Sequence, residues 1–206
     1  SLASTLSVGG AANFASTVTV TGNAVFVADI QKKTAGTSNF AAGVNAGNSI
    51  ESGGNYNVVI GDEAGTALTT GDSNTLIGYA AGDALTDMGS NTAIGSGAMG
   101  GATSASGNVA IGDDAGGLAT NTSDNNVWIG LHAGGATTSG ASNVLIGYAS
   151  GDAITTGGSN TFVGYNSGTA QTTGSANTLV GNTSGAAITT GDNNVLIGYG
   201  AGDAFD

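Results

Sequence analysis

The side chains in this sequence that could perform acid–base chemistry are carboxylates and one histidine. The 14 Asp and Glu residues include two neighbouring pairs, Asp62–Glu63 and Asp113–Asp114. Glycoside cleavage needs two carboxyl groups about 5–9 Å apart, whereas neighbouring side chains of an extended chain point to opposite faces. No serine or cysteine constellation accompanies His132, the only histidine. We therefore expect a protein that is not an enzyme.

A calcium site is the other chemistry that acidic residues at turns could support. Calcium takes about six or more converging oxygens, and the best local cluster is Asp113 and Asp114 with Asp124 in a slightly longer stretch. The Gly/Asp nonapeptide of calcium-binding repeats is absent, so solvated turn residues are the favoured explanation. The chain has no cysteine, which excludes disulfides and thiolate metal sites. We expect no metal and no cofactor.

A row of exposed aromatic side chains could stack against the sugar rings of a glycan. Four tyrosines in this chain each follow a glycine at the same place in a recurring pattern. Packing between neighbouring repeats is the favoured alternative explanation, and glycan contact is the functional one. The four residues are Tyr79, Tyr148, Tyr165 and Tyr199.

A row of threonines recurs in the same pattern and could suggest ice binding. A flat ice-binding face usually needs a second row two residues away, and here those positions are mostly Ala and Gly. A hydroxyl ladder that supports turns is the better explanation. The row comprises Thr69, Thr86, Thr103, Thr120, Thr138, Thr155, Thr172 and Thr189.

These spacings come from an internal repeat of about 17 residues, N-[VT]-x-[IV]-G-x-x-[AS]-G-x-A-[LI]-T-T-G-x-x. The ten copies all begin with Asn and all have Gly at position 5, counted from that Asn. The asparagines are Asn39, Asn57, Asn74, Asn91, Asn108, Asn126, Asn143, Asn160, Asn177 and Asn194. The glycines are Gly43, Gly61, Gly78, Gly95, Gly112, Gly130, Gly147, Gly164, Gly181 and Gly198.

The repeat predicts the fold. Asn amides stacked about 4.8 Å apart can form a hydrogen-bonded ladder, and an invariant Gly indicates positive φ or close backbone approach. Each repeat has two short extended segments, "NVLIG"-like and "DAITT"-like, and is too small to bury its own apolar face. We therefore expect an all-β fold, a parallel β-solenoid (β-roll) of about ten 17-residue coils over residues 39–206. Residues 1–38 would form a fibre-like β lead-in and junction.

The first segment of each repeat is apolar on both of its faces. Positions 2 and 4 point one way and position 3 the other, yet position 4 is Ile or Val in nine copies and position 3 of the same copies is apolar too. The coil interior covers one face, and the other would be a stripe too long to leave exposed on a monomer. We expect a parallel homotrimer, with a dimer as the less favoured alternative. The pattern leaves open which of positions 3 and 4 faces the axis.

Charge excludes several classes of partner. The net charge is −12, and Lys32 and Lys33 are the only cations. Binding to nucleic acid or to an anionic membrane surface is therefore disfavoured. No run of 18 apolar residues exists, so we expect no membrane insertion. The chain starts without methionine, and its last coil lacks a polar cap, so we expect a piece of a longer protein.

Two stretches resemble known families. "NTAIGSGAMGGATSASG" (Asn91–Gly107) and "NVAIGDDAGGLA" (Asn108–Ala119) resemble the repeat in the heads of trimeric autotransporter adhesins, whose unit is about three residues shorter. That family folds as a trimeric left-handed parallel β-roll. "TLSVGGAANFASTVTVTGNAVFV" (Thr5–Val27) resembles the glycine-punctuated shafts of bacteriophage tail fibres.

The combined resemblance implies a structural fibre protein, a rigid trimeric shaft of a phage tail or head fibre that serves host-surface attachment. Its place would be the virion, and its partners would be other fibre or virion proteins and a host-surface glycan or protein. The alternative is a bacterial surface adhesin of the trimeric autotransporter kind, which would grip a host matrix with its sides. A glycan-degrading tailspike is the third and least favoured function.

Overall fold

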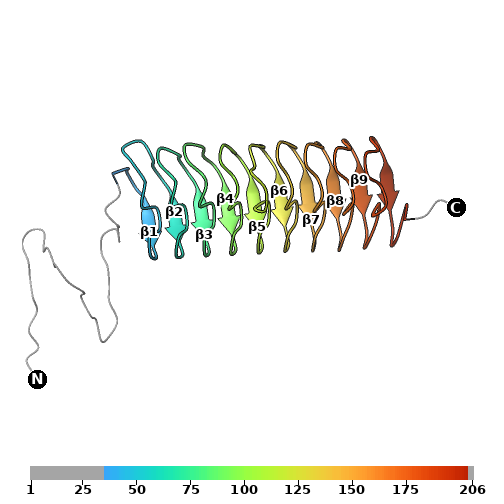
Figure 1. Cartoon of the computed structure of the whole chain (residues 1–206), viewed down its shortest axis with the longest axis horizontal. Coiled ribbons are helices and arrows are strands. Elements are labelled where there is room, and N and C mark those ends of the chain that lie inside the picture. Colours follow the sequence, from blue (N-terminus) through green and yellow to red (C-terminus); the bar gives the residue numbers. More distant parts are fainter. Residues whose placement is uncertain (1–34, 204–206) are drawn as a thin grey trace, which may run out of the picture. The chain divides into compact units, whose positions relative to one another are not determined.

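The computed structural model describes residues 35–203 and shows them as a stack of coils (Figure 1). Each coil contributes one strand to a single ten-stranded parallel sheet, in which the strands follow chain order. The strands are β1 (Phe40–Ala42), β2 (Val58–Ile60), β3 (Thr75–Ile77), β4 (Thr92–Ile94), β5 (Val109–Ile111), β6 (Val127–Ile129), β7 (Val144–Ile146), β8 (Thr161–Val163), β9 (Thr178–Val180) and β10 (Val195–Ile197). The predicted all-β parallel solenoid of about 17-residue coils is therefore confirmed.

Most of the predicted lead-in, residues 1–34, lies outside the described residues. The valine-rich stretch that resembles a fibre shaft falls in this part. Within the described part of the chain there is no helix that could cross a membrane.

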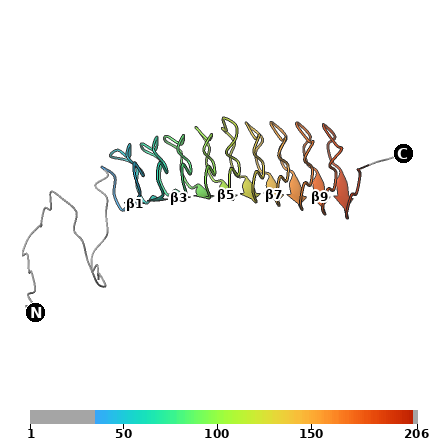
Figure 2. The same ribbon diagram turned by 60° about the horizontal axis from the view of Figure 1, so that its bottom comes forward.

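The strands lie in register, so that equivalent repeat positions stack on one another. Val59 of β2 is opposite Leu76 of β3, which is opposite Ala93 of β4. All ten strands line one side of the stack and the connecting segments form the other sides (Figure 2). The stacking step of a parallel sheet is about 4.8 Å, so ten strands extend about 43 Å along the stack.

The prediction of a second strand in each coil, formed by the "DAITT"-like segment, is wrong. Across residues 35–203, the "DAITT"-like segments form turns, and their one β-bridge is an isolated contact between Ala102 and Asn121. The physical reason is the residue at position 9, which has positive φ (Gly82, φ 57°). The N–H of Leu85 then donates back to the carbonyl of Gly82 over 3.1 Å, which closes a local turn where a strand would continue.

Position 3 faces the interior of the coil, so position 4 is the one on its outer side. Position 12 and the small residue at position 8 complete the core. The residues at position 3 of β2 to β9 are all fully buried: Val59, Leu76, Ala93, Ala110, Trp128, Leu145, Phe162 and Leu179. Positions 2 and 4 consequently point out of the coil.

Candidate functional site

The asparagines at position 1 form a buried hydrogen-bonded ladder. In one step of it, the side-chain amide of Asn74 donates to Oδ1 of Asn57 over 3.1 Å, and its backbone N–H donates to the same oxygen over 2.8 Å. The amide also donates to the carbonyl oxygen of Met88 in its own coil, over 3.1 Å. Equivalent amide-to-amide bonds of 2.9–3.3 Å recur along the array. The ladder therefore ties each coil both to its neighbour and across its own turn.

The glycines at position 5 are required by close contact between coils. Each ends a strand with a φ between 130° and 145°, a region that a residue with a side chain rarely adopts. A Cβ on Gly61 would collide with the carbonyl oxygen of Gly78 in the next coil, and a Cβ on Gly78 would collide with that of Gly95. The column of glycines therefore lets the backbones of successive coils approach closely.

The threonine row is a hydroxyl ladder, as we expected. The Thr69 hydroxyl donates to the carbonyl oxygen of Thr86 over 3.1 Å, and that of Thr155 donates to Thr172, also over 3.1 Å. One member was assigned wrongly from the sequence: Thr122, and not Thr120, donates to the carbonyl of Thr138. Most hydroxyls of the row are thus engaged in bonds between coils.

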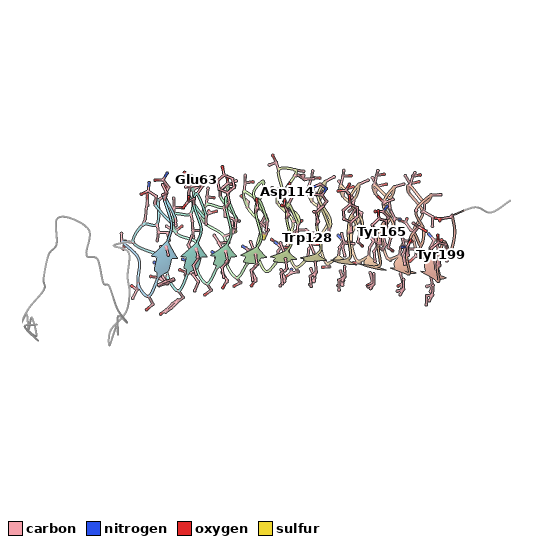
Figure 3. All side chains as sticks on the ribbon, turned by 90° about the horizontal axis from the view of Figure 1, so that it is seen from below. Glu63, Asp114, Trp128, Tyr165 and Tyr199 are labelled. Atoms are coloured by element: carbon pink, nitrogen blue, oxygen red, sulfur yellow. The ribbon has the colours of Figure 1, made fainter. Side chains whose placement is uncertain are left out.

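The outer face of the sheet is a regular apolar surface that runs along the array. We define it by the side chains at positions 2 and 4 of the repeat, which project from the strands away from the loops (Figure 3). Most are half-buried by their neighbours along the sheet. In the last coil they are open, with Val195 68% and Ile197 70% exposed. None of the strands β1 to β10 carries a charged residue.

The tyrosines at position 6 are exposed, but two of them are already stacked on each other. The rings of Tyr148 and Tyr165 are 5.0 Å apart between centroids with an interplanar angle of 11°. Each ring thus uses one face on its neighbour, while 46% and 51% of these residues stay exposed. This contact between rings of successive coils is the arrangement that the packing explanation predicts for the pair. Tyr79 and Tyr199 are also exposed and have no stacked neighbour among the described residues.

The carboxylates act as acceptors for the turns of the preceding coil. Oδ1 of Asp62 accepts the backbone N–H of Val44 over 3.0 Å, and Oε1 of Glu63 accepts the side-chain amide of Asn45 over 2.9 Å. Asp124 accepts the N–H of Ser106 over 2.7 Å. Glu63 and Asp114 lie on the loop side of the coils (Figure 3).

The three aspartates considered as the best local calcium cluster, Asp113, Asp114 and Asp124, do not form a metal site. Within residues 35–203, no three His, Asp or Glu side chains are placed to hold one metal ion. Asp124 is used by Ser106, and Asp114 faces His132, with 3.7 Å between Oδ2 and Nε2. Burial raises the pKa of Asp152, and the nearby His132 opposes that shift. This group is one histidine between two acids, without the converging oxygens that calcium needs.

One packing constraint was not predicted from the sequence: the side chains at positions 3 and 9 share the interior of the coil, so that a large residue at one requires a small residue at the other. Position 9 is Gly in nine copies and Met99 in one, and Met99 is fully buried. The signal that could have found this constraint was present, because Met99 occurs only where position 3 is Ala both in its own coil, at Ala93, and in the following coil, at Ala110.

Comparison with known proteins identifies no relative: no protein-family model, no curated protein and no solved structure matches the chain.

Proposed function

We propose that this chain is a structural fibre protein, a rigid segment of the shaft of a phage tail fibre that serves host-surface attachment. Its working form in this proposal is a parallel homotrimer. Its role is mechanical: it would hold an attachment site at a fixed distance from the virion. It performs no catalysis in this proposal.

The observation that carries the proposal is that each coil is bonded to its neighbours on every side. In the coil Asn74–Ser90, backbone N–H groups donate to both adjacent coils at five separate points of the circumference. These bonds are Thr75 to Asn91 (2.8 Å), Gly78 to Ile60 (2.8 Å), Ala80 to Asp62 (3.0 Å), Gly82 to Ala98 (2.9 Å) and Ser90 to Asp72 (2.9 Å). Bending the stack would stretch bonds on one side whichever way it bends, so the array resists bending in all directions.

The side chains support a mechanical role as well. Two sets of polar residues recur most regularly, Asn at position 1 and Thr at position 13. Their side chains form hydrogen bonds with neighbouring coils. Several carboxylates do the same. A catalytic or binding site keeps such groups free to meet a ligand, whereas a shaft has no such need.

The resemblance of Thr5–Val27 to tail-fibre shafts is the reason for favouring a phage fibre over a bacterial surface adhesin. The flanking sequence separates these two owners. A membrane anchor in the full-length protein would indicate an adhesin, and a tail-attachment domain would indicate a phage fibre.

The decisive test is the mass of the purified chain, measured by light scattering on a sizing column. We expect three chains of 19.4 kDa, about 58 kDa in total. Negative-stain images should show straight particles that lengthen in proportion when repeats are added. A mass of 19.4 kDa at micromolar concentration would overturn the trimeric shaft.

A second test addresses catalysis. Incubation with polysaccharide from the host surface should release no new reducing ends above those of a boiled sample. Sugar release that rises with protein concentration would replace the shaft by a tailspike enzyme.

A further inference from the structure

We propose that the outer face of the sheet is the surface through which copies of this chain pack, side by side, parallel and in register. This inference rests on the proposed parallel homotrimer and adds which surface makes it and that the copies lie in register. The occupant of the face is a second copy of the same array, joined by a third around a common axis.

The outer face is mainly apolar and nearly uniform in composition. Position 4 is apolar in all ten strands: Ala42, Ile60, Ile77, Ile94, Ile111, Ile129, Ile146, Val163, Val180 and Ile197. Position 2 is Phe, Val or Thr throughout. A mostly β-branched strip about 43 Å long, partly exposed to water and without a charge to protect it, is rare on a monomer. Burying it removes apolar area from water, which is the main driving force of association.

Charge identifies where two copies can approach. Residues 35–203 contain no lysine or arginine, so two arrays repel wherever their carboxylates meet. Acidic residues occur on the turns, as with Glu63 and Asp114 on the loop side (Figure 3), whereas the strands have none. The outer face is therefore the side on which close contact encounters no like charge.

The regular step of the face favours a copy over an unrelated partner. Its side chains form ridges that repeat at the step of a parallel sheet, about 4.8 Å, over ten strands. A partner must repeat at the same step to fill the grooves along the whole length. A second copy of this array has the same step because it has the same stacked strands.

The strand β1 indicates the orientation. It is the one strand with a large residue at position 2 and a small one at position 4, namely Phe40 and Ala42. In β2 to β10, position 2 is Val or Thr and position 4 is Ile or Val. In β1 the large side chain at position 2 thus compensates in volume for the small side chain at position 4.

Such compensation is expected if each strand of one copy lies beside the equivalent strand of the next copy. Rotation about an axis along the stack brings position 2 of one copy beside position 4 of the next, so Phe40 fills the space above Ala42. In an antiparallel pair, Phe40 would instead face Val195 and Ile197 of β10, which are both large. Parallel packing in register therefore keeps the contact uniformly filled, as tight cores require.

Single-cysteine variants test surface and orientation together, because the natural chain has no cysteine. Ile77→Cys and Val180→Cys place a thiol on the outer face near opposite ends, and Thr156→Cys is a control on an exposed turn. After oxidation, or treatment with a short bismaleimide, we expect covalent chain dimers for each outer-face variant alone. The control should stay single. An antiparallel contact would link neither variant alone, and that outcome would overturn the orientation.

A matched pair of charge variants tests the surface independently. Ile146→Glu and Thr156→Glu add the same charge to the same coil, on the outer face and on an exposed turn respectively. We expect the mass of Ile146→Glu to fall from three chains to one, with an unchanged circular dichroism spectrum, and Thr156→Glu to stay at three.

The outcomes separate this inference from the proposed function. If the natural chain is a monomer, both fail. If the natural chain and Ile146→Glu both have the mass of three chains, and the outer-face cysteines do not link, the trimer stands and the outer face is not its interface. A misfolded Ile146→Glu would leave the cysteine result to decide, because that test disrupts no contact.

Discussion

At the scale of single residues, position 9 shows how tightly the interior is filled. A Cβ on Gly82 would lie 2.8 Å from a methyl group of Leu76 and 2.9 Å from one of Leu85, closer than real side chains pack. Where position 3 shrinks to Ala, as at Ala93 and Ala110, position 9 grows to the fully buried Met99. The backbone of Met99 keeps the left-handed conformation of the glycines that it replaces, with φ 54°.

This pairing predicts a compensating double substitution. Met99→Gly should lower the free energy of unfolding by about 1–3 kcal/mol, because it opens a cavity but relieves a non-glycine residue at positive φ. Ala93→Leu alone should also destabilise by about 1–3 kcal/mol through overpacking. The double variant restores the Gly–Leu arrangement of the other coils and should recover most of the loss. Chemical denaturation of all four proteins gives the coupling, and additive losses would contradict the pairing.

The asparagine ladder predicts a position-dependent cost. Asn108→Ala removes the oxygen that accepts two bonds from Asn126, and leaves a bond to Ser123 unmade. Buried groups left without partners cost about 1–3 kcal/mol each, so we expect a loss of about 2–4 kcal/mol in urea unfolding. Asn48→Ala, at an exposed turn position outside the left-handed region, should cost well under about 1 kcal/mol. Equal losses for the two variants would show that the ladder contributes little.

These residues also mark what sequence could and could not predict. The ladder and the position-5 glycines were predictable because the same residue recurs in every coil, so one stacking argument covers all copies. Met99 was not, because its fit depends on two alanines in different coils, and only the stacked structure brings these together. Which face of the strand is internal was likewise open, since both faces are apolar.

At the scale of elements, the 18-residue coil Asn108–Asn125 shows how an extra residue is absorbed. The segment around Leu118 bulges outward, with 54% of that residue exposed. Asn121 then reaches the level of Ala102, and Thr122 takes the place in the hydroxyl row that simple counting gives to Thr120. Counting residues predicted the coil but not the site of the bulge, because local hydrogen bonds choose that site. Here Oδ1 of Asn121 accepts the N–H and hydroxyl of Ser123.

The turns that follow position 9 predict a pH dependence. Burial raises the pKa of Asp83 above the ordinary 3.8, and the carboxylate of Glu63 adds to the shift, while backbone hydrogen bonds oppose it. A raised pKa means that the folded chain holds this proton more tightly than the unfolded chain. Ionisation therefore destabilises the fold, and the penalty appears as pH rises above about 4 through the folded pKa.

Asp83→Asn should remove that penalty. Asp83 is partly exposed, so we expect a rise in Tm of only about 1–2 °C at pH 7, which vanishes at pH 3. Asp113→Asn, at an exposed site, controls for the general loss of one negative charge and should gain less. Thermal scans from pH 3 to 8 provide the comparison. A gain that persists at pH 3 would exclude the ionisation of Asp83 as its cause.

At the scale of the whole molecule, the array is an apolar strip on an acidic body. The net charge of the chain is −12, and the described part contains no lysine or arginine to pair with its carboxylates. Three parallel copies would therefore associate against mutual repulsion, held by apolar contact alone. Most protein assemblies that carry ion pairs across an interface loosen as salt is added, whereas this one should tighten.

Because the charges of the copies repel one another, added salt should strengthen the assembly. Raising sodium chloride from about 0.01 M to 1 M shortens the screening length from about 30 Å to about 3 Å, so repulsion between copies falls while the apolar contact persists. We expect the concentration at which the assembly half-dissociates to fall at least several-fold, as measured by light scattering on diluted samples. A variant with Asp62→Asn and Glu63→Gln carries less repulsive charge and should respond less to salt, which separates screening from general salting-out. Dissociation by salt would instead show that ion pairs hold the copies together, and the uncharged outer face could not then be the contact.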